Sequence, residues 1–177
     1  KKNNNDYNKK LVINFFSNLK IRDLGDSLVI KLINNGYNNI KDILNISQDD
    51  LLKIEGIKEK LSKKIFNNLH SRLENIDILC LMVASNCFGR GLGDKKLKVF
   101  LDEYPNFVDE EMNKEEIRKK LLNIDGFSEK TIQKIIDNIE NFKVFYKEQI
   151  PNFVKDLIKK ENVKNDLKKI SILENKN

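Results

Sequence analysis

The sequence is poor in the residues that build most metal, disulfide and catalytic sites. Its 177 residues contain two cysteines, two prolines, one histidine and no tryptophan. Cys80 and Cys87 lie seven residues apart, which matches neither a zinc-site spacing nor the cysteine framework of a secreted protein. We therefore interpret both as buried free thiols. His70 has no second ligand beside it and predicts neither a metal nor a catalytic site, so we expect a surface helix residue.

Long apolar runs and strand-like alternation are also absent. No segment approaches the roughly 18 apolar residues of a membrane span, and nothing resembles a signal peptide, so we expect an intracellular protein of the cytoplasm or nucleoid. Apolar residues instead recur at the helical period, as in Ile57, Leu61, Ile65 and Leu69, which predicts an all-α protein. The chain lacks an initiating Met, which suggests a piece of a longer protein.

The charge is moderately basic. Thirty-three Lys and Arg residues face 27 Asp and Glu residues, giving a net charge of +6 and a pI near 9.1. Such a balance is typical of proteins with a polyanionic partner, although the abundance of Asn, Ile and Lys also fits an AT-rich genome, bacterial or viral. The placement of the lysines therefore matters more than their sum.

The chain repeats itself. Residues 51–60, LLKIEGIKEK, return as residues 121–130, LLNIDGFSEK, at an offset of 70. Leu24-Gly25-Asp26 is matched by Leu92-Gly93-Asp94 at an offset of 68. The sequence thus predicts four turns between helices, arranged as two pairs. The two offsets imply a small insertion in the second pair, which we place in the loop near residues 103–106.

The four turns share a pattern that suits phosphate binding. Glycine permits positive φ, and the helix that follows directs unpaired N–H groups and its positive dipole end outward. An ordinary connector in which glycine caps a helix is the alternative for any single turn. Asp26 would repel phosphate at the first turn, and Arg90 would either contact DNA or form a surface salt bridge. The candidate phosphate-binding residues are Gly25, Gly56, Ile57, Lys58, Lys60, Arg90, Gly91, Gly93, Lys95, Lys96, Gly126, Ser128 and Lys130.

These turns resemble helix-hairpin-helix motifs, and their paired duplication resembles the four-motif domain of bacterial-type NAD-dependent DNA ligases. The flanks are similar too: residues 13–26 resemble the family's entry into the first hairpin, residues 81–93 its third hairpin, and Phe145 to Ile158 its exit towards a BRCT domain. The resemblance covers residues 11–163. Lys58 and Ser128 depart from it, because many hairpins have a second glycine there.

The resemblance implies two tandem double helix-hairpin-helix units packed as one compact domain, with a C-terminal helical tail. We place a linker at residues 1–12, the first pair at 13–76, the second at 77–149, and an exit helix and linker at 150–177. The residues joining the pairs, 73–77, contain neither Gly nor Pro. Each unit of about 65 residues would be marginal alone, which favours packing together.

The function implied is sequence-independent clamping of nicked duplex DNA in replication and repair. The chain has no Lys-x-Asp-Gly motif, so it cannot form the enzyme-AMP intermediate by itself. We expect this segment to be non-catalytic and without a cofactor or metal of its own. The parent ligase would use NAD and Mg, with the remaining ligase domains as partners in cis.

Two other functions remain open. Paired helical hairpins also serve as protein-interaction or DNA-binding modules of nuclease and repair complexes. In glycosylase/lyases a Lys after the hairpin attacks the sugar, and Lys60 and Lys130 occupy similar positions. The tail reads as a solvated basic helix or a linker, with Lys159, Lys160, Lys164, Lys168 and Lys169.

Overall fold

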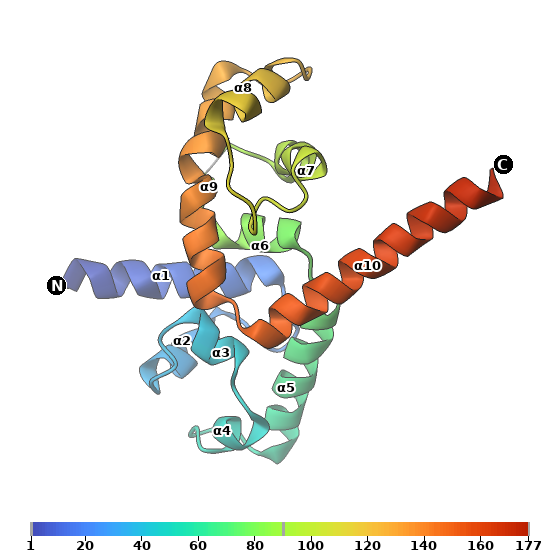
Figure 1. Cartoon of the computed structure of the whole chain (residues 1–177). Coiled ribbons are helices and arrows are strands. Elements are labelled where there is room, and N and C mark those ends of the chain that lie inside the picture. Colours follow the sequence, from blue (N-terminus) through green and yellow to red (C-terminus); the bar gives the residue numbers. More distant parts are fainter. Residues whose placement is uncertain (1, 90, 177) are drawn as a thin grey trace. The chain divides into compact units, whose positions relative to one another are not determined.

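Helices make up all the regular secondary structure of the described residues. The computed structural model describes residues 2–89 and 91–176, which form ten α-helices and no strand. Figure 1 labels these helices along the chain. This confirms the all-α prediction. No helix in these ranges is long and apolar enough to cross a membrane.

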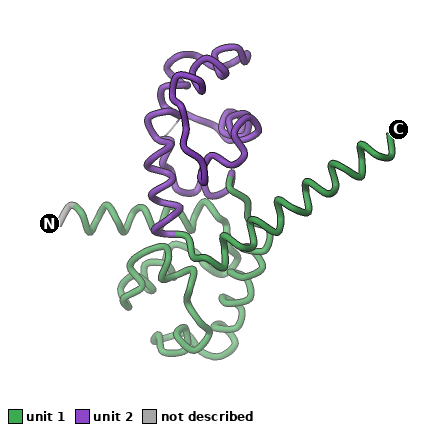
Figure 2. The backbone as a smooth tube through the Cα atoms, viewed as in Figure 1, with its two compact units in different colours: residues 1–78, 150–177 green, residues 79–149 purple. Residues whose placement is uncertain are grey.

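The chain divides into two compact units, coloured separately in Figure 2. Unit 1 consists of residues 1–78 and 150–177, and unit 2 of residues 79–149. The C-terminal segment, expected to stand apart as an exit helix, thus groups with the first half of the chain. The packing of the two halves into one body, and the domain boundaries, stay predictions.

Unit 1 is built around the apolar face of its first helix. Val12, Phe15, Phe16 and Leu19 follow the helical period and are at most 2% exposed. The rings of Phe15 and Phe16 meet edge to face, with centroids 5.1 Å apart. This helix begins at Lys2, so the segment expected to be a linker is helical. The helices of unit 1 are α1 (Lys2–Leu19), α2 (Asp26–Asn34), α3 (Ile40–Leu44), α4 (Gln48–Leu52), α5 (Glu59–Glu74) and α10 (Asn152–Asn175).

Helix α10 packs against α5 through an aromatic stack. The His70 ring on α5 lies 4.2 Å from the Phe66 ring and 5.8 Å from that of Phe153 on α10, measured between centroids. The expectation of a surface histidine needs correction: His70 is half-buried, and this burial lowers the pKa of its imidazole while Glu74 opposes the change. Nothing near His70 in the sequence indicates Phe153.

Unit 2 has an aromatic core centred on Phe142. The Phe142 ring lies 5.8 Å from Phe88 and 5.7 Å from Phe107, and Phe107 in turn contacts Phe100 at 5.1 Å. Cys80 and Cys87 are free thiols, as expected, but only partly buried. The helices are α6 (Ile78–Ser85), whose first residue belongs to unit 1, α7 (Asp94–Glu103), α8 (Lys114–Leu122) and α9 (Glu129–Gln149).

The length difference between the two repeats lies in a helix and not in the loop after α7. The capping residue Ser47 precedes Gly56 by nine residues, whereas the equivalent Asn113 precedes Gly126 by thirteen, so α8 is longer than α4. The connector before Asn113, residues 104–112, is three residues shorter than residues 35–46 before Ser47 and contains no counterpart of α3, while α7 is one residue longer than α2. Placing the insertion near residues 103–106 was therefore wrong.

Candidate functional site

Four hairpins share one three-residue turn geometry. Hairpin 1 joins α1 to α2, hairpin 2 joins α4 to α5, hairpin 3 joins α6 to α7, and hairpin 4 joins α8 to α9. Each turn has a residue with positive φ, then a buried apolar residue, then the residue that precedes the second helix. The first positions are Asp23, Gly56, Gly91 and Gly126, with φ of 64°, 85°, 91° and 91°. Glycine adopts this conformation without strain, and Asp tolerates it better than most residues do.

The middle residue anchors each turn in the core. Leu24, Ile57, Leu92 and Phe127 are at most 9% exposed. The amide of Ile57 donates to the carbonyl of Ile54 at 3.1 Å, and Leu24 and Phe127 make the same bond to Ile21 and Ile124. The candidate Ile57 therefore has its side chain in the core and its N–H already used, so its role in the turn is packing.

In the described part of the chain, three of the helices that follow the turns begin without a side-chain cap, as α10 also does after Pro151, whereas α3, α4 and α8 are capped. Asn39, Ser47 and Asn113 each accept a backbone N–H with their side chains and so cap α3, α4 and α8. Gly25, Lys58 and Gly93 precede α2, α5 and α7 without any side-chain cap among the described residues. Hairpins 1, 2 and 3 therefore present helix N-termini whose amides are open to an outside acceptor.

Hairpin 4 is the exception. The Ser128 hydroxyl accepts the N–H of Thr131 at 3.2 Å and lies 3.0 Å from the Thr131 hydroxyl. A helix N-terminus capped in this way offers one amide fewer to a ligand. The departure noted in the sequence at Ser128 thus has a local structural role.

Charge follows the same register at all four turns. The first helical residue is acidic in every hairpin: Asp26, Glu59, Asp94 and Glu129. The argument that Asp26 repels phosphate therefore applies to each turn and does not single out hairpin 1. The second helical residue distinguishes hairpin 1 from the other three. It is Ser27 in hairpin 1 and an exposed lysine in the others, namely Lys60, Lys95 and Lys130.

Hairpin 1 is held by neutral and cationic groups of α5. The Asn68 side-chain amide donates to the carbonyl of Arg22 at 3.0 Å and to the carboxylate of Asp23 at 2.9 Å. Arg72 Nε donates to the carbonyl of Leu19, the last residue of α1, at 2.9 Å. These bonds fasten the first turn to the second hairpin of the same unit.

The structure thus places the sequence candidates at four turns. Gly56, Lys58 and Lys60 lie together at hairpin 2, and Gly91, Gly93, Lys95 and Lys96 at hairpin 3. Gly126, Ser128 and Lys130 form the turn of hairpin 4, and Gly25 that of hairpin 1. Arg90 lies outside the described residues. Within those residues, no group of three or more His, Cys, Asp and Glu side chains could hold a metal ion.

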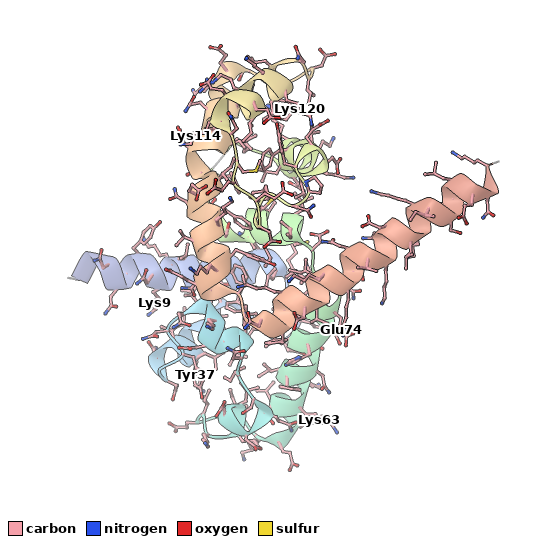
Figure 3. All side chains as sticks on the ribbon, in the orientation of Figure 1. Lys9, Tyr37, Lys63, Glu74, Lys114 and Lys120 are labelled. Atoms are coloured by element: carbon pink, nitrogen blue, oxygen red, sulfur yellow. The ribbon has the colours of Figure 1, made fainter. Side chains whose placement is uncertain are left out.

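Three residues at these turns escaped the sequence analysis. Asp23 occupies the positive-φ position of hairpin 1, while Lys31 and Lys134 approach the turn glycines of neighbouring hairpins. Figure 3 draws the described side chains as sticks on the ribbon and labels Lys63 and Glu74 on α5 and Lys114 and Lys120 on α8. The register of the turns could have indicated Asp23, because it lies two residues before Gly25 as Gly91 does before Gly93.

Comparison with known proteins agrees with this geometry. Residues 18–70 match the model of the SAM-like helix-hairpin-helix tandem family. The chain is 41% identical over 140 residues to a DNA ligase of Acanthamoeba polyphaga mimivirus, covering 78% of this chain and 22% of that protein. It is 32% identical over 143 residues to the putative DNA ligase 205R of Invertebrate iridescent virus 6, covering 81% of this chain and 22% of that protein. No solved structure matches it.

The chain spans about a fifth of the length of these two relatives. The matched part includes most of both units, since either alignment covers more than three quarters of the chain. Residues 18–70 thus match the SAM-like helix-hairpin-helix tandem family, and the chain is similar to a segment of viral DNA ligases.

Proposed function

We propose that this chain binds duplex DNA without reading its sequence, as the DNA-clamping domain of an NAD-dependent DNA ligase that seals nicks. The observation that carries the proposal is the contrast between capped and uncapped helices. The connecting helices α3, α4 and α8 are capped by side chains, whereas three of the four helices that follow hairpin turns are not. Open amides beside lysines are suited to phosphate oxygens.

Lys58 strengthens this argument, because it is a poor residue for stability where it stands. It precedes the first residue of α5, where the positive end of the helix dipole disfavours a cation. The next helical positions add Lys60 in hairpin 2 and Lys95 and Lys96 in hairpin 3. A bound anion would offset the repulsion between these lysines and the positive end of the helix dipole. A turn with only a structural role would gain no stability from the lysines.

Contacts of this kind position a duplex and carry no sequence information. The relatives named as DNA ligases suggest the setting in which the domain acts. The parent enzyme would supply the adenylation chemistry from domains in cis, with NAD and Mg as cofactors. The part of this domain would be to hold the DNA around the nick.

Titration with DNA tests the proposal. The chain is titrated against nicked, intact and single-stranded DNA of arbitrary sequence at several salt concentrations, together with Lys60→Glu, Lys96→Glu and the control Lys41→Glu on α3. We expect duplex binding whose logarithm falls with log salt at a slope of about −0.9 per phosphate neutralised. The two turn variants should lose far more affinity than the control, and a preference for nicked DNA would favour the ligase role. Weak binding that does not respond to salt would refute the proposal.

A protein-interaction role is the second candidate, and one observation favours it. The far part of α10 exposes five large apolar side chains, each more than half exposed: Val163, Leu167, Ile170, Ile172 and Leu173. Exposed apolar residues gathered on one helix are typical of a protein contact. The titration discriminates the two, since an interaction module would have little affinity for DNA. The lyase reading gains no support, because Lys60 and Lys130 are exposed side chains rather than residues of a pocket.

A further inference from the structure

In each unit, a lysine from one hairpin lies against the turn glycine of the other. A Cβ added to Gly56 of hairpin 2 would lie 2.7 Å from Nζ of Lys31, which belongs to α2 of hairpin 1. A Cβ added to Gly91 of hairpin 3 would lie 3.7 Å from Nζ of Lys134, which belongs to α9 of hairpin 4. Apart from each glycine's own chain neighbours, this ammonium is the only group of the described residues within 4 Å of that position.

The two lysines occupy equivalent positions in the repeat. Lys31 lies six residues after Gly25, and Lys134 lies six residues after Ser128, the residues that precede α2 and α9. Four residues further on, Asn35 and Asn138 each donate a side-chain amide to the backbone carbonyl of the corresponding lysine, at 2.7 Å and 2.8 Å. The same arrangement therefore occurs independently in both units.

Hairpins 1 and 4 receive no such cation from the described residues. The sixth residue after Lys58 is again a lysine, Lys64, but the position of hairpin 1 equivalent to Gly56 is Asp23, whose carboxylate accepts from Asn68 and forms no ion pair among the described residues. The sixth residue after Gly93 is Val99, and a Cβ added at Gly126 of hairpin 4 has no heavy atom of residues 2–89 and 91–176 within 4 Å, chain neighbours aside. Each unit thus has one turn with a cation from its neighbour and one turn without.

The turns that receive the cation are also those best prepared for an anion. Hairpins 2 and 3 combine an uncapped second helix with a lysine at its second position, Lys60 or Lys95. Hairpin 1 has Ser27 there, and hairpin 4 uses Ser128 to cap its own helix. The Lys31 ammonium, partly buried, has no carboxylate partner among the described residues. A partly desolvated cation without a partner gains most from an anion placed beside it.

We propose that Lys31 and Lys134 bind DNA phosphates at the turns of hairpins 2 and 3, so that these two hairpins make the main DNA contacts while hairpins 1 and 4 brace them. The inference rests on the proposed function, and it names the residues and hairpins that perform it. In hairpin 2, where many hairpins have a second glycine, Lys58 and Lys31 together add two cations to the turn.

The test measures the salt slope of duplex binding for Lys31→Met and Lys134→Met, which keep an unbranched stem but remove the charge. Lys41→Met on α3 and Lys119→Met on α8 are matched controls that change the net charge equally. We expect each turn variant to bind about tenfold more weakly at low salt and to lose about 0.9 from the slope, while the controls retain the wild-type slope. Lys31→Arg and Lys134→Arg should restore the slope.

Each result has one meaning. A turn variant that loses affinity with an unchanged slope, or that behaves as its control does, overturns the inference and leaves the proposed function standing. Restoration by arginine together with an unchanged unfolding temperature supports it, because a structural role would be seen in the melting curve. If the wild-type chain does not bind duplex DNA at all, the proposed function itself is refuted, so the two failures are distinguishable.

Discussion

Replacing Lys58 by Ser should make the protein more stable and a weaker DNA binder. The backbone at Lys58 has φ −101° and ψ 178°, close to the −90° and 164° of Ser47, which caps α4 through its hydroxyl. A serine at position 58 can therefore accept an amide of the first turn of α5. Side-chain caps stabilise a helix by about 1 kcal/mol, and removing a cation from the N-terminus adds about 0.3–1 kcal/mol.

The expected gain of about 1–2 kcal/mol is large enough to measure. For a unit of about 100 residues, 1 kcal/mol corresponds to roughly 4–8 °C in Tm. Thermal unfolding followed by circular dichroism, compared with Lys58→Gln, separates the two contributions, since glutamine removes the charge without adding a good cap. The same serine should weaken duplex binding, because its hydroxyl occupies an amide that a phosphate would use.

The reciprocal variant serves as the control. Ser128→Ala removes the hydroxyl that accepts the Thr131 amide at 3.2 Å and should cost about 1 kcal/mol. A Lys58→Ser protein that melts at or below the wild-type temperature, while Ser128→Ala loses stability as expected, would refute the view that α5 begins with unsatisfied amides. Stabilisation without any loss of DNA affinity would contradict only the functional part.

Two further predictions concern unit 1. Gly56→Ala and Gly36→Ala both place alanine at positive φ, 85° and 99°, so each should lower the free energy of unfolding in urea by about 1–2 kcal/mol. Only Gly56→Ala should also weaken DNA binding, because its Cβ displaces Lys31. Equal effects of the two variants on binding would count against that contact. Burial lowers the pKa of His70 in the folded chain. As the pH falls below about 6.5, the unfolded chain therefore takes up the proton before the folded chain does. The contribution of His70 to the free energy of unfolding is thus full above that pH and is lost as the pH falls towards the lower folded pKa. His70→Phe should keep the stack with Phe66 and Phe153, and its unfolding midpoint should change less between pH 7 and 5 than that of the wild type. An equally large change in the variant would show that another group causes the pH dependence.

The sequence predicted the features of this protein that depend on near neighbours. The helical period and the turn residues indicate an all-α chain with four hairpins, and Gly56 and Gly126 mark positions of positive φ, because backbone conformation there depends on the residue itself and those beside it. The lysines that follow the turns of hairpins 2, 3 and 4 can likewise be read from the sequence. The flanking segments similar to DNA ligases are consistent with the relatives found.

The tertiary structure decided which of these features can act together. It places Ile57 in the core, Asn68 on the turn of hairpin 1 and Lys31 against Gly56. It also brings Phe153 onto His70 from the far end of the chain. Such contacts join residues separated by tens of positions, so they depend on how helices pack rather than on local pattern. The sequence thus determined where the hairpins lie, and only the fold determined which turns carry a second cation.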